Sequence, residues 1–303
     1  MNHISRVLAA IDFSKPARSA FDYALALSQR HRAELVVVQA VPPDQPFGWH
    51  ARDRRALTAK LRRRAEASNV EFTDRVQTGD PAEIILLHAR SLRPDVIVLG
   101  THQRRGIDRL RLGSISERVV AKATVPVLLV PPGRQRDTIR PFSHVAVAVD
   151  FGAGTHGAVE HALAMATKAA DQITLLHVVA PSSSAVPAHL IGYGIAASQA
   201  PAVRDAERRL DELAVRVKRQ TSAAIHTRVL IGNTTTEVSR AVDSIAANLL
   251  VVGVPKRNVV SRALFGTTAA RVLRVIRVPM LAVPAVISAG AHQAHSSSLQ
   301  HAA

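Results

Sequence analysis

The sequence of 303 residues contains no cysteine, and only 3% of its residues are aromatic. The first absence excludes disulfide bonds, thiolate-bound metals and a cysteine nucleophile, and it suits a reducing cytoplasm. The second leaves few side chains on which the bases of a nucleic acid could stack. Aliphatic side chains must therefore build the core, since hydrophobic residues make up 47% of the chain.

Long apolar runs are also absent. Runs such as DVIVLG (95–100) and NLLVVG (248–253) fall well short of the roughly 20 residues that cross a bilayer. The N-terminal MNHISRVLAAIDF shows no signal-peptide pattern. We expect a soluble, cytoplasmic protein without a membrane partner.

Positive charge is in excess, at a formal net value of +16. Such a surface attracts polyanions, and nucleotides, nucleic acids and acidic lipids all belong to that class. The charge by itself does not choose among them.

The two halves of the chain repeat one another. RVLAAIDF (6–13) matches HVAVAVDF (144–151), which pairs Asp12 with Asp150 at an offset of 138. In the later part of each half the offset becomes 153. The difference predicts a 15-residue insertion in the second half, within residues 180–198.

Short apolar runs alternate with helical patterns within each half. Runs without polar alternation are typical of parallel strands that helices cover on both faces. We predict two α/β domains, each a doubly wound parallel sheet of five strands with helices on both faces. In the first half the predicted strands are 4–12, 34–41, 70–77, 95–99 and 126–130, and the predicted helices are 16–30, 51–67, 81–91 and 115–123.

These patterns divide the chain into a first domain (1–132), a linker (133–140), a second domain (141–284) and a tail (285–303). The linker is rich in polar residues and flanked by proline. The tail lacks periodicity and is predicted to be disordered; its histidines fit a solvated tail better than a metal site.

Two glycine-led loops, 100–114 and 253–267, follow equivalent strands. Ligands of doubly wound sheets bind beyond the carboxyl ends of the strands, and a helix N-terminus there favours a phosphate group. Ser114–Glu117 also fits a capping box, which needs no ligand. Because the same spacing recurs in both halves, we favour a phosphate site.

The chain resembles a tandem universal stress protein, with two UspA-type domains between residue 4 and about 284. The nucleotide-binding branch of that family carries Gly-x2-Gly-x9-Gly-[Ser/Thr] after the fourth strand and an aspartate after the first. The resemblance implies an adenine-nucleotide alpha hydrolase-like fold and ATP as ligand, with Mg²⁺ left open. The positions that match, with Ala40 and Val178 at the family's adenine contact, are Asp12, Ala40, Gly100, Gly113 and Ser114 in the first half and Asp150, Val178, Gly253, Gly266 and Thr267 in the second.

Both halves depart from the motif at its middle glycine, which is Gln103 in the first and Lys256 in the second. If a left-handed backbone is needed there, a side chain costs about 1–2 kcal/mol, or roughly tenfold in affinity. The ammonium group of Lys256 offers a charge in compensation. Both positions stay candidate ligand contacts.

Three other patterns in the sequence point to different functions. GAGTHG (152–157) fits a dinucleotide fingerprint, but no acidic residue ends the next strand, so we expect glycines of a helix start. The basic segment 52–67 fits nucleic-acid binding, but its Leu57 and Leu61 lie on one face, as in a surface helix. No catalytic or metal-binding motif stands out, so an enzyme is not expected.

The sequence thus predicts a stress-response protein that binds ATP and acts as a sensor or signalling module. The alternatives are a scaffold that binds no nucleotide and, less favoured, a nucleic-acid binder. Because single domains of this family pair, the two halves are expected to form an internal pseudo-dimer through their last strands, VPVLLV (125–130) and VPMLAV (278–283). Association of two chains into a homodimer stays open.

Overall fold

A computed structural model describes most of the chain. The described residues are 4–12, 14–42, 51–101, 113–132, 142–166, 168, 170–181, 191–255 and 267–285. The predicted linker lies outside them, and so does the predicted tail apart from Ala285. Ala285 is buried, and its N–H donates to the carbonyl of Val254.

The first half alternates strands and helices as predicted, with every boundary within two residues of its predicted place. Its elements are β1 (Arg6–Ala10), α1 (Lys15–His31), β2 (Glu34–Val41), α2 (Ala51–Ala67), β3 (Phe72–Thr78), α3 (Pro81–Leu92), β4 (Val96–Gly100), α4 (Ser114–Lys122) and β5 (Val127–Val130).

The second half repeats this order with one longer helix. Its elements are β6 (His144–Ala148), α5 (Gly154–Met165), β7 (Gln172–Val179), α6 (Ile191–Lys218), β8 (Ala224–Ile231), α7 (Thr234–Ser244), β9 (Leu249–Val254), α8 (Thr267–Val275) and β10 (Met280–Pro284). Helix α6 has 28 residues, whereas its counterpart α2 has 17. Part of the predicted insertion therefore extends this helix at its N-terminal end.

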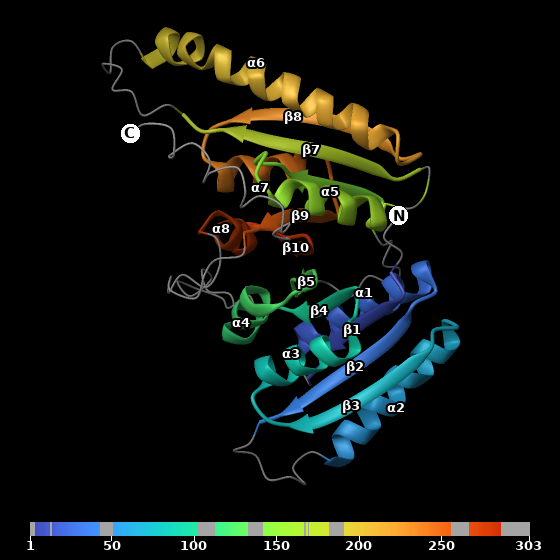
Figure 1. Cartoon of the computed structure of the whole chain (residues 1–303). Coiled ribbons are helices and arrows are strands. Elements are labelled where there is room, and N and C mark those ends of the chain that lie inside the picture. The colour runs from blue at the N-terminus through green and yellow to red at the C-terminus, as the bar shows by residue number, and fades with distance from the viewer. Residues whose placement is uncertain are drawn as a thin grey trace, which may run out of the picture.

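Both halves contribute to one ten-stranded sheet in the order β3-β2-β1-β4-β5-β10-β9-β6-β7-β8. Neighbouring strands are parallel within each half, while β5 and β10 pair antiparallel, with Leu128 opposite Leu281. Figure 1 shows these two strands where the halves meet. The predicted association through the last strands is confirmed, and it leaves neither strand with an open edge at the junction.

Each face of the sheet carries a continuous apolar layer that spans both halves. One layer contains Phe21 of α1 and Leu210 of α6, both fully buried. The other contains Val119 of α4 and Val242 of α7. Helices α1, α2, α5 and α6 therefore cover one face, and α3, α4, α7 and α8 cover the other. None of the described helices is both long enough and apolar enough to cross a membrane.

Helix starts follow the sequence signals. The Asp80 side chain accepts a hydrogen bond from the Glu83 N–H at 3.0 Å, ahead of proline at the first position of α3. Asn233 caps α7 in the same way. Gly79 and Gly232, one residue before these caps, have φ values of 150° and 142°. A side chain would be strained in that conformation, so glycine is required before both helices.

Candidate functional site

Strand register brings the predicted residues of the first half to one edge. Ala10 at the end of β1 lies opposite Val38 of β2 and Leu99 of β4. Two residues further along β2 is Ala40, and Gly100 directly follows Leu99. Because adjacent strands lie about 4.8 Å apart, Asp12, Ala40 and Gly100 share the carboxyl edge. This edge also contains the topological switch point of the half. The strand that follows β1 in the chain, β2, lies on one side of it, whereas β4 lies on its other side and is followed by β5 further out.

The second half has the same arrangement. Ala148 at the end of β6 lies opposite Leu176 of β7 and Val252 of β9. The register therefore puts Asp150 level with Val178 and close to Gly253. Val178 and Ala40 are both half-buried, as expected for strand-end residues that close a core and still reach solvent.

Both aspartates organise the turn that follows their strand. Asp12 Oδ1 accepts a hydrogen bond from the Ser14 N–H at 2.8 Å. Asp150 Oδ1 accepts from the Gly152 N–H at 2.8 Å and from Thr155 Oγ1 at 3.0 Å. Each carboxylate is exposed, and its Oδ2 has no hydrogen-bond partner among the described residues. One oxygen of each aspartate therefore holds the turn, and the other is without a partner among the described residues.

The first glycine of each motif has a packing role. A Cβ on Gly100 would lie 2.5 Å from the backbone carbonyl carbon and oxygen of Pro16, at the start of α1. A Cβ on Gly253 would lie 2.9 Å from the backbone carbonyl of Gly154 in α5. Such distances are not tolerated, so glycine is what lets each helix approach its strand. Gly154 belongs to the segment GAGTHG, which opens α5 as predicted.

Gly113 differs, because a Cβ there would meet no described atom within 4 Å. It is the N-cap of α4, with φ −60° and no side-chain hydrogen bond to the helix start. The capping-box alternative is therefore wrong, since Ser114 is the first helical residue and is exposed. Neither conformation nor packing within the described residues demands glycine here. The space and the uncapped helix start suit a close-lying anion.

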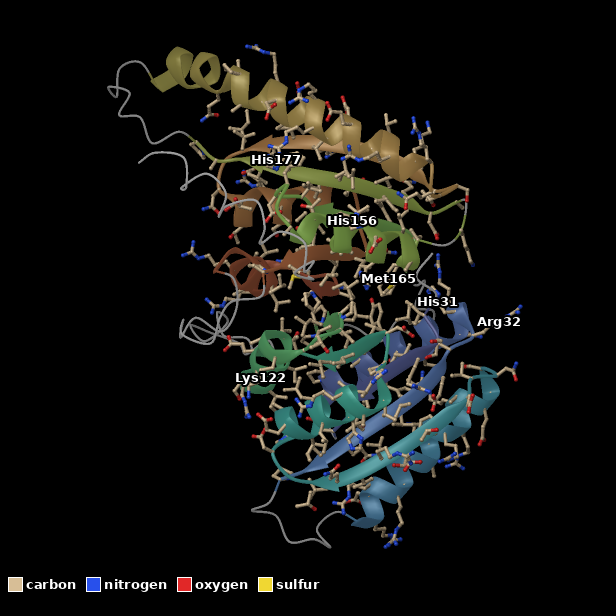
Figure 2. The ribbon with its side chains drawn as sticks, viewed as in Figure 1. His31, Arg32, Lys122, His156, Met165 and His177 are labelled. Carbon is tan, nitrogen blue, oxygen red and sulfur yellow. The ribbon has the colours of Figure 1, made fainter. Side chains whose placement is uncertain are left out.

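Ion pairs hold α4 against the start of α3. Arg118 contacts Asp80 at 2.8 Å and Glu83 at 3.0 Å, and Lys122 of α4 (Figure 2) contacts Glu83 at 2.9 Å. The hydrogen bond from Arg118 lowers the pKa of Asp80. Lys122, then Arg118, lower the pKa of Glu83. The groups are well exposed, so each pair contributes little stability, and together they link α4 to the first turn of α3.

The second half adds a stack that the sequence analysis missed. The Phe151 ring lies 4.6 Å from the His177 ring, and the Arg209 guanidinium lies 4.0 Å from the Phe151 centroid. Figure 2 shows His177 on β7. Its Nδ1 lies 2.7 Å from the carbonyl oxygen of Val149. Phe151 directly follows Asp150 and has φ 57°. Only the repeat of Asp-Phe in both halves hinted that this position matters.

The remaining candidates cannot be placed as side chains. Gln103, Lys256 and Gly266 lie outside the described residues. Thr267 begins α8, as Ser114 begins α4. Within each half, the structure thus brings together the aspartate, the residue at the end of the second strand and the first glycine of the motif. The helices α4 and α8 start at matching positions of the two halves.

Comparisons with known proteins agree with this architecture. A sequence model of the universal stress protein family matches residues 3–131 and again 141–284. A universal stress protein of Thermus aquaticus, named for the QAH/OAS sulfhydrylase 3'region, is 40% identical over 133 residues, which cover 41% of this chain and 96% of that protein. A universal stress protein of Mycolicibacterium smegmatis is 32% identical over 142 residues, covering 43% and 47%.

Among solved structures, a universal stress protein from Archaeoglobus fulgidus is 18% identical and superposes with a TM-score of 0.72, covering 93% of this chain and 98% of that one. At this identity the likeness concerns the fold. The two family matches together span most of the sequence. The chain therefore belongs to the universal stress protein family, as a tandem of two such domains.

Proposed function

We propose that the chain binds an adenine nucleotide, ATP, at the carboxyl edge of its sheet and acts in the cytoplasm as a stress sensor or signalling module. The observation that carries this proposal is the convergence of Asp12, Ala40 and Gly100 at the switch point of the first half. Asp150, Val178 and Gly253 repeat it in the second half.

The residues present fit such a ligand. Oδ2 of Asp12, which has no partner among the described residues, is an acceptor suited to a ribose hydroxyl, and half-buried Ala40 offers apolar contact to a base. Among the described residues, nothing lies within 4 Å of a Cβ on Gly113 and no side chain caps the N–H groups of α4, so a phosphate group could approach them. The helix dipole favours an anion at that end. Mg²⁺ would neutralise part of the phosphate charge when bound.

Binding rather than catalysis is part of the proposal. Asp12 and Asp150 are each hydrogen-bonded into a turn, which suits a fixed ligand contact better than a group that must gain and lose a proton. A scaffold that binds no nucleotide is the alternative. The packing role of Gly100 and Gly253 favours it in part, because these two glycines would be needed in either case.

Calorimetric titration of ATP, with and without Mg²⁺, tests the proposal. The variants are Gly113→Val and Gly266→Val, each expected to abolish the heat from its own half. Ser91→Val, on an exposed position at the far end of α3, is the matched control and should bind like the parent. Absence of binding by the parent protein would favour the scaffold. ATP turnover at an enzyme-like rate, lost in Asp150→Asn, would overturn the view that the chain is not an enzyme.

A further inference from the structure

A basic groove of about 620 Å³ lies between α2 and β3, at the outer end of the first half. Figure 1 shows α2 beside β3, the strand at one end of the sheet. Val76 of the groove lies opposite Gln39 of β2, one residue before Ala40, so the groove borders the carboxyl edge described above. It is lined by Arg54, Arg55, Thr58, Ala59, Arg62, Arg63, Asp74 and Val76.

The charge of the groove is specific to this half. Helix α2 carries seven basic and two acidic residues, whereas its counterpart α6 carries five and four. Arg62 is paired with Asp74 at 2.6 Å. Arg55 and Arg63 are exposed and have no ion-pair partner within the part of the chain that the structure describes. The groove therefore holds an excess of positive charge that an anionic partner could neutralise.

The other wall of the groove is a sheet edge. β3 stands at one end of the strand order and pairs only with β2 among the described strands. Its second backbone edge is thus available for another strand. Val76 of β3 lines the groove with 50% of its surface exposed. Asp74 and Val76, two residues apart, point to the same face.

From these features we infer that the groove binds an extended acidic segment of a partner protein, which adds as a strand to β3. Arg55 and Arg63 are eight residues apart on one helix, or about 12 Å along its axis. Residues i and i+4 of an extended strand are about 13 Å apart. Acidic residues at i and i+4 would meet the two arginines, and an aliphatic residue at i+2 would cover Val76. Hydrogen bonds between the main chains of the partner segment and β3 supply affinity, and the side chains of the partner segment supply specificity.

A nucleic acid fits the groove less well. None of the described residues that line it is aromatic, so this lining offers bases no stacking surface. A phosphate backbone would be repelled by the Asp74 carboxylate and would make no polar contact with exposed Val76. An acidic peptide places its apolar residue on Val76 and leaves the Arg62–Asp74 pair intact.

Fluorescence anisotropy with the full chain tests the inference. The probe is a labelled heptapeptide with glutamate at positions 2 and 6, valine at position 4 and threonine elsewhere. Saturable binding is expected at 150 mM salt. The double variant Arg55→Glu/Arg63→Glu should lose at least tenfold in affinity, and the peptide with lysine in place of glutamate should not bind. Arg90→Glu/Arg271→Glu makes the same charge change on the other face of the sheet and should bind the peptide normally.

Strand addition is tested separately with two peptides that are N-methylated at either the odd or the even positions. One should lose binding and the other keep it, because alternate N–H groups of an added strand face β3. Equal binding by both, or no loss in Arg55→Glu/Arg63→Glu, would overturn the inference. So would displacement of the peptide by a 20-nucleotide single-stranded or duplex DNA that binds more tightly at the same salt. Unchanged thermal unfolding of Arg55→Glu/Arg63→Glu shows that any loss is not due to misfolding.

Discussion

Arg30 of α1 and Asp171, just before β7, form an ion pair that joins the two halves. Their side chains are only 7% and 4% exposed. Asp171 also accepts a hydrogen bond from the Lys168 N–H at 2.7 Å. Nearby on the same helix, the Tyr23 ring stacks on Phe142 of the second half at 5.9 Å. The halves are thus joined by specific side chains as well as by the pairing of β5 with β10.

Replacing Asp171 by asparagine should destabilise the protein by about 3 kcal/mol, because it removes the carboxylate charge that faces the buried guanidinium of Arg30. Urea unfolding followed by circular dichroism measures the change. Asp22→Asn is the control, since its partner Arg64 is 45% exposed and such pairs contribute about 1 kcal/mol or less. The double variant Arg30→Met/Asp171→Leu should lose less than Asp171→Asn alone. Equal effects of Asp171→Asn and Asp22→Asn would contradict the role given to the buried pair.

Replacing Gly100 and replacing Gly113, two glycines of the first-half motif, should destabilise the protein to different extents. Gly100→Ala is expected to cost at least about 1–3 kcal/mol, as in overpacked cores, because its Cβ would collide with the Pro16 backbone. Gly113→Ala, at an N-cap where a Cβ meets no described atom, should cost less, about 0.5–1 kcal/mol, because alanine is a poorer N-cap than glycine. The comparison uses midpoints of urea unfolding without nucleotide. If Gly100→Ala proved neutral, the packing explanation for this glycine would fail.

Much of the fold could be predicted because it depends on local patterns. Apolar runs marked the buried strands, and Asp80 and Asn233 marked helix starts. The pairing of β5 with β10 followed from the repeat together with the resemblance to a family whose domains associate. The insertion was located correctly, but its partly helical form was not predicted.

Apart from the pairing of β5 with β10, specific contacts between distant residues could not be predicted. The reason for Gly100 is the backbone of Pro16, more than 80 positions away, and sequence spacing alone suggested a ligand instead. The buried pair of Arg30 and Asp171 has no copy in the repeat, because the position equivalent to Asp171 is Ala33. A repeat analysis finds what two halves share, so it misses contacts that only one half makes.

Because one oxygen of Asp150 holds the turn and the other does not, two replacements of this residue should differ in their effect on stability and agree in their effect on ATP binding. Asp150→Asn keeps an acceptor for the Gly152 N–H and Thr155 Oγ1, so unfolding should change by less than about 0.5 kcal/mol. Asp150→Ala loses the turn as well and should cost about 1 kcal/mol, like a lost helix cap. If Oδ2 contacts the nucleotide, both variants should weaken ATP binding in the second half. Tight ATP binding by Asp150→Ala would exclude this carboxylate from the site.

His144, at the start of β6, predicts a loss of stability in mild acid. Burial, reinforced by nearby His226, lowers its pKa from the usual 6.5. Its Nε2 lies 2.9 Å from Thr174 Oγ1. Because the folded state binds the proton less readily than the unfolded chain, stability is full above about pH 6.5 and falls as the pH drops through that value.

The free energy of unfolding should therefore decrease between pH 7.5 and pH 5.0, and His144→Gln should decrease less over the same interval. His156→Gln, at a side chain that is 84% exposed, is the matched control and should follow the parent. His88, whose pKa is also lowered by burial, contributes with the same sign, so the double variant His88→Gln/His144→Gln should show the flattest profile. A profile for His144→Gln as steep as that of the parent would mean that protonation of His144 is not resisted by the folded state.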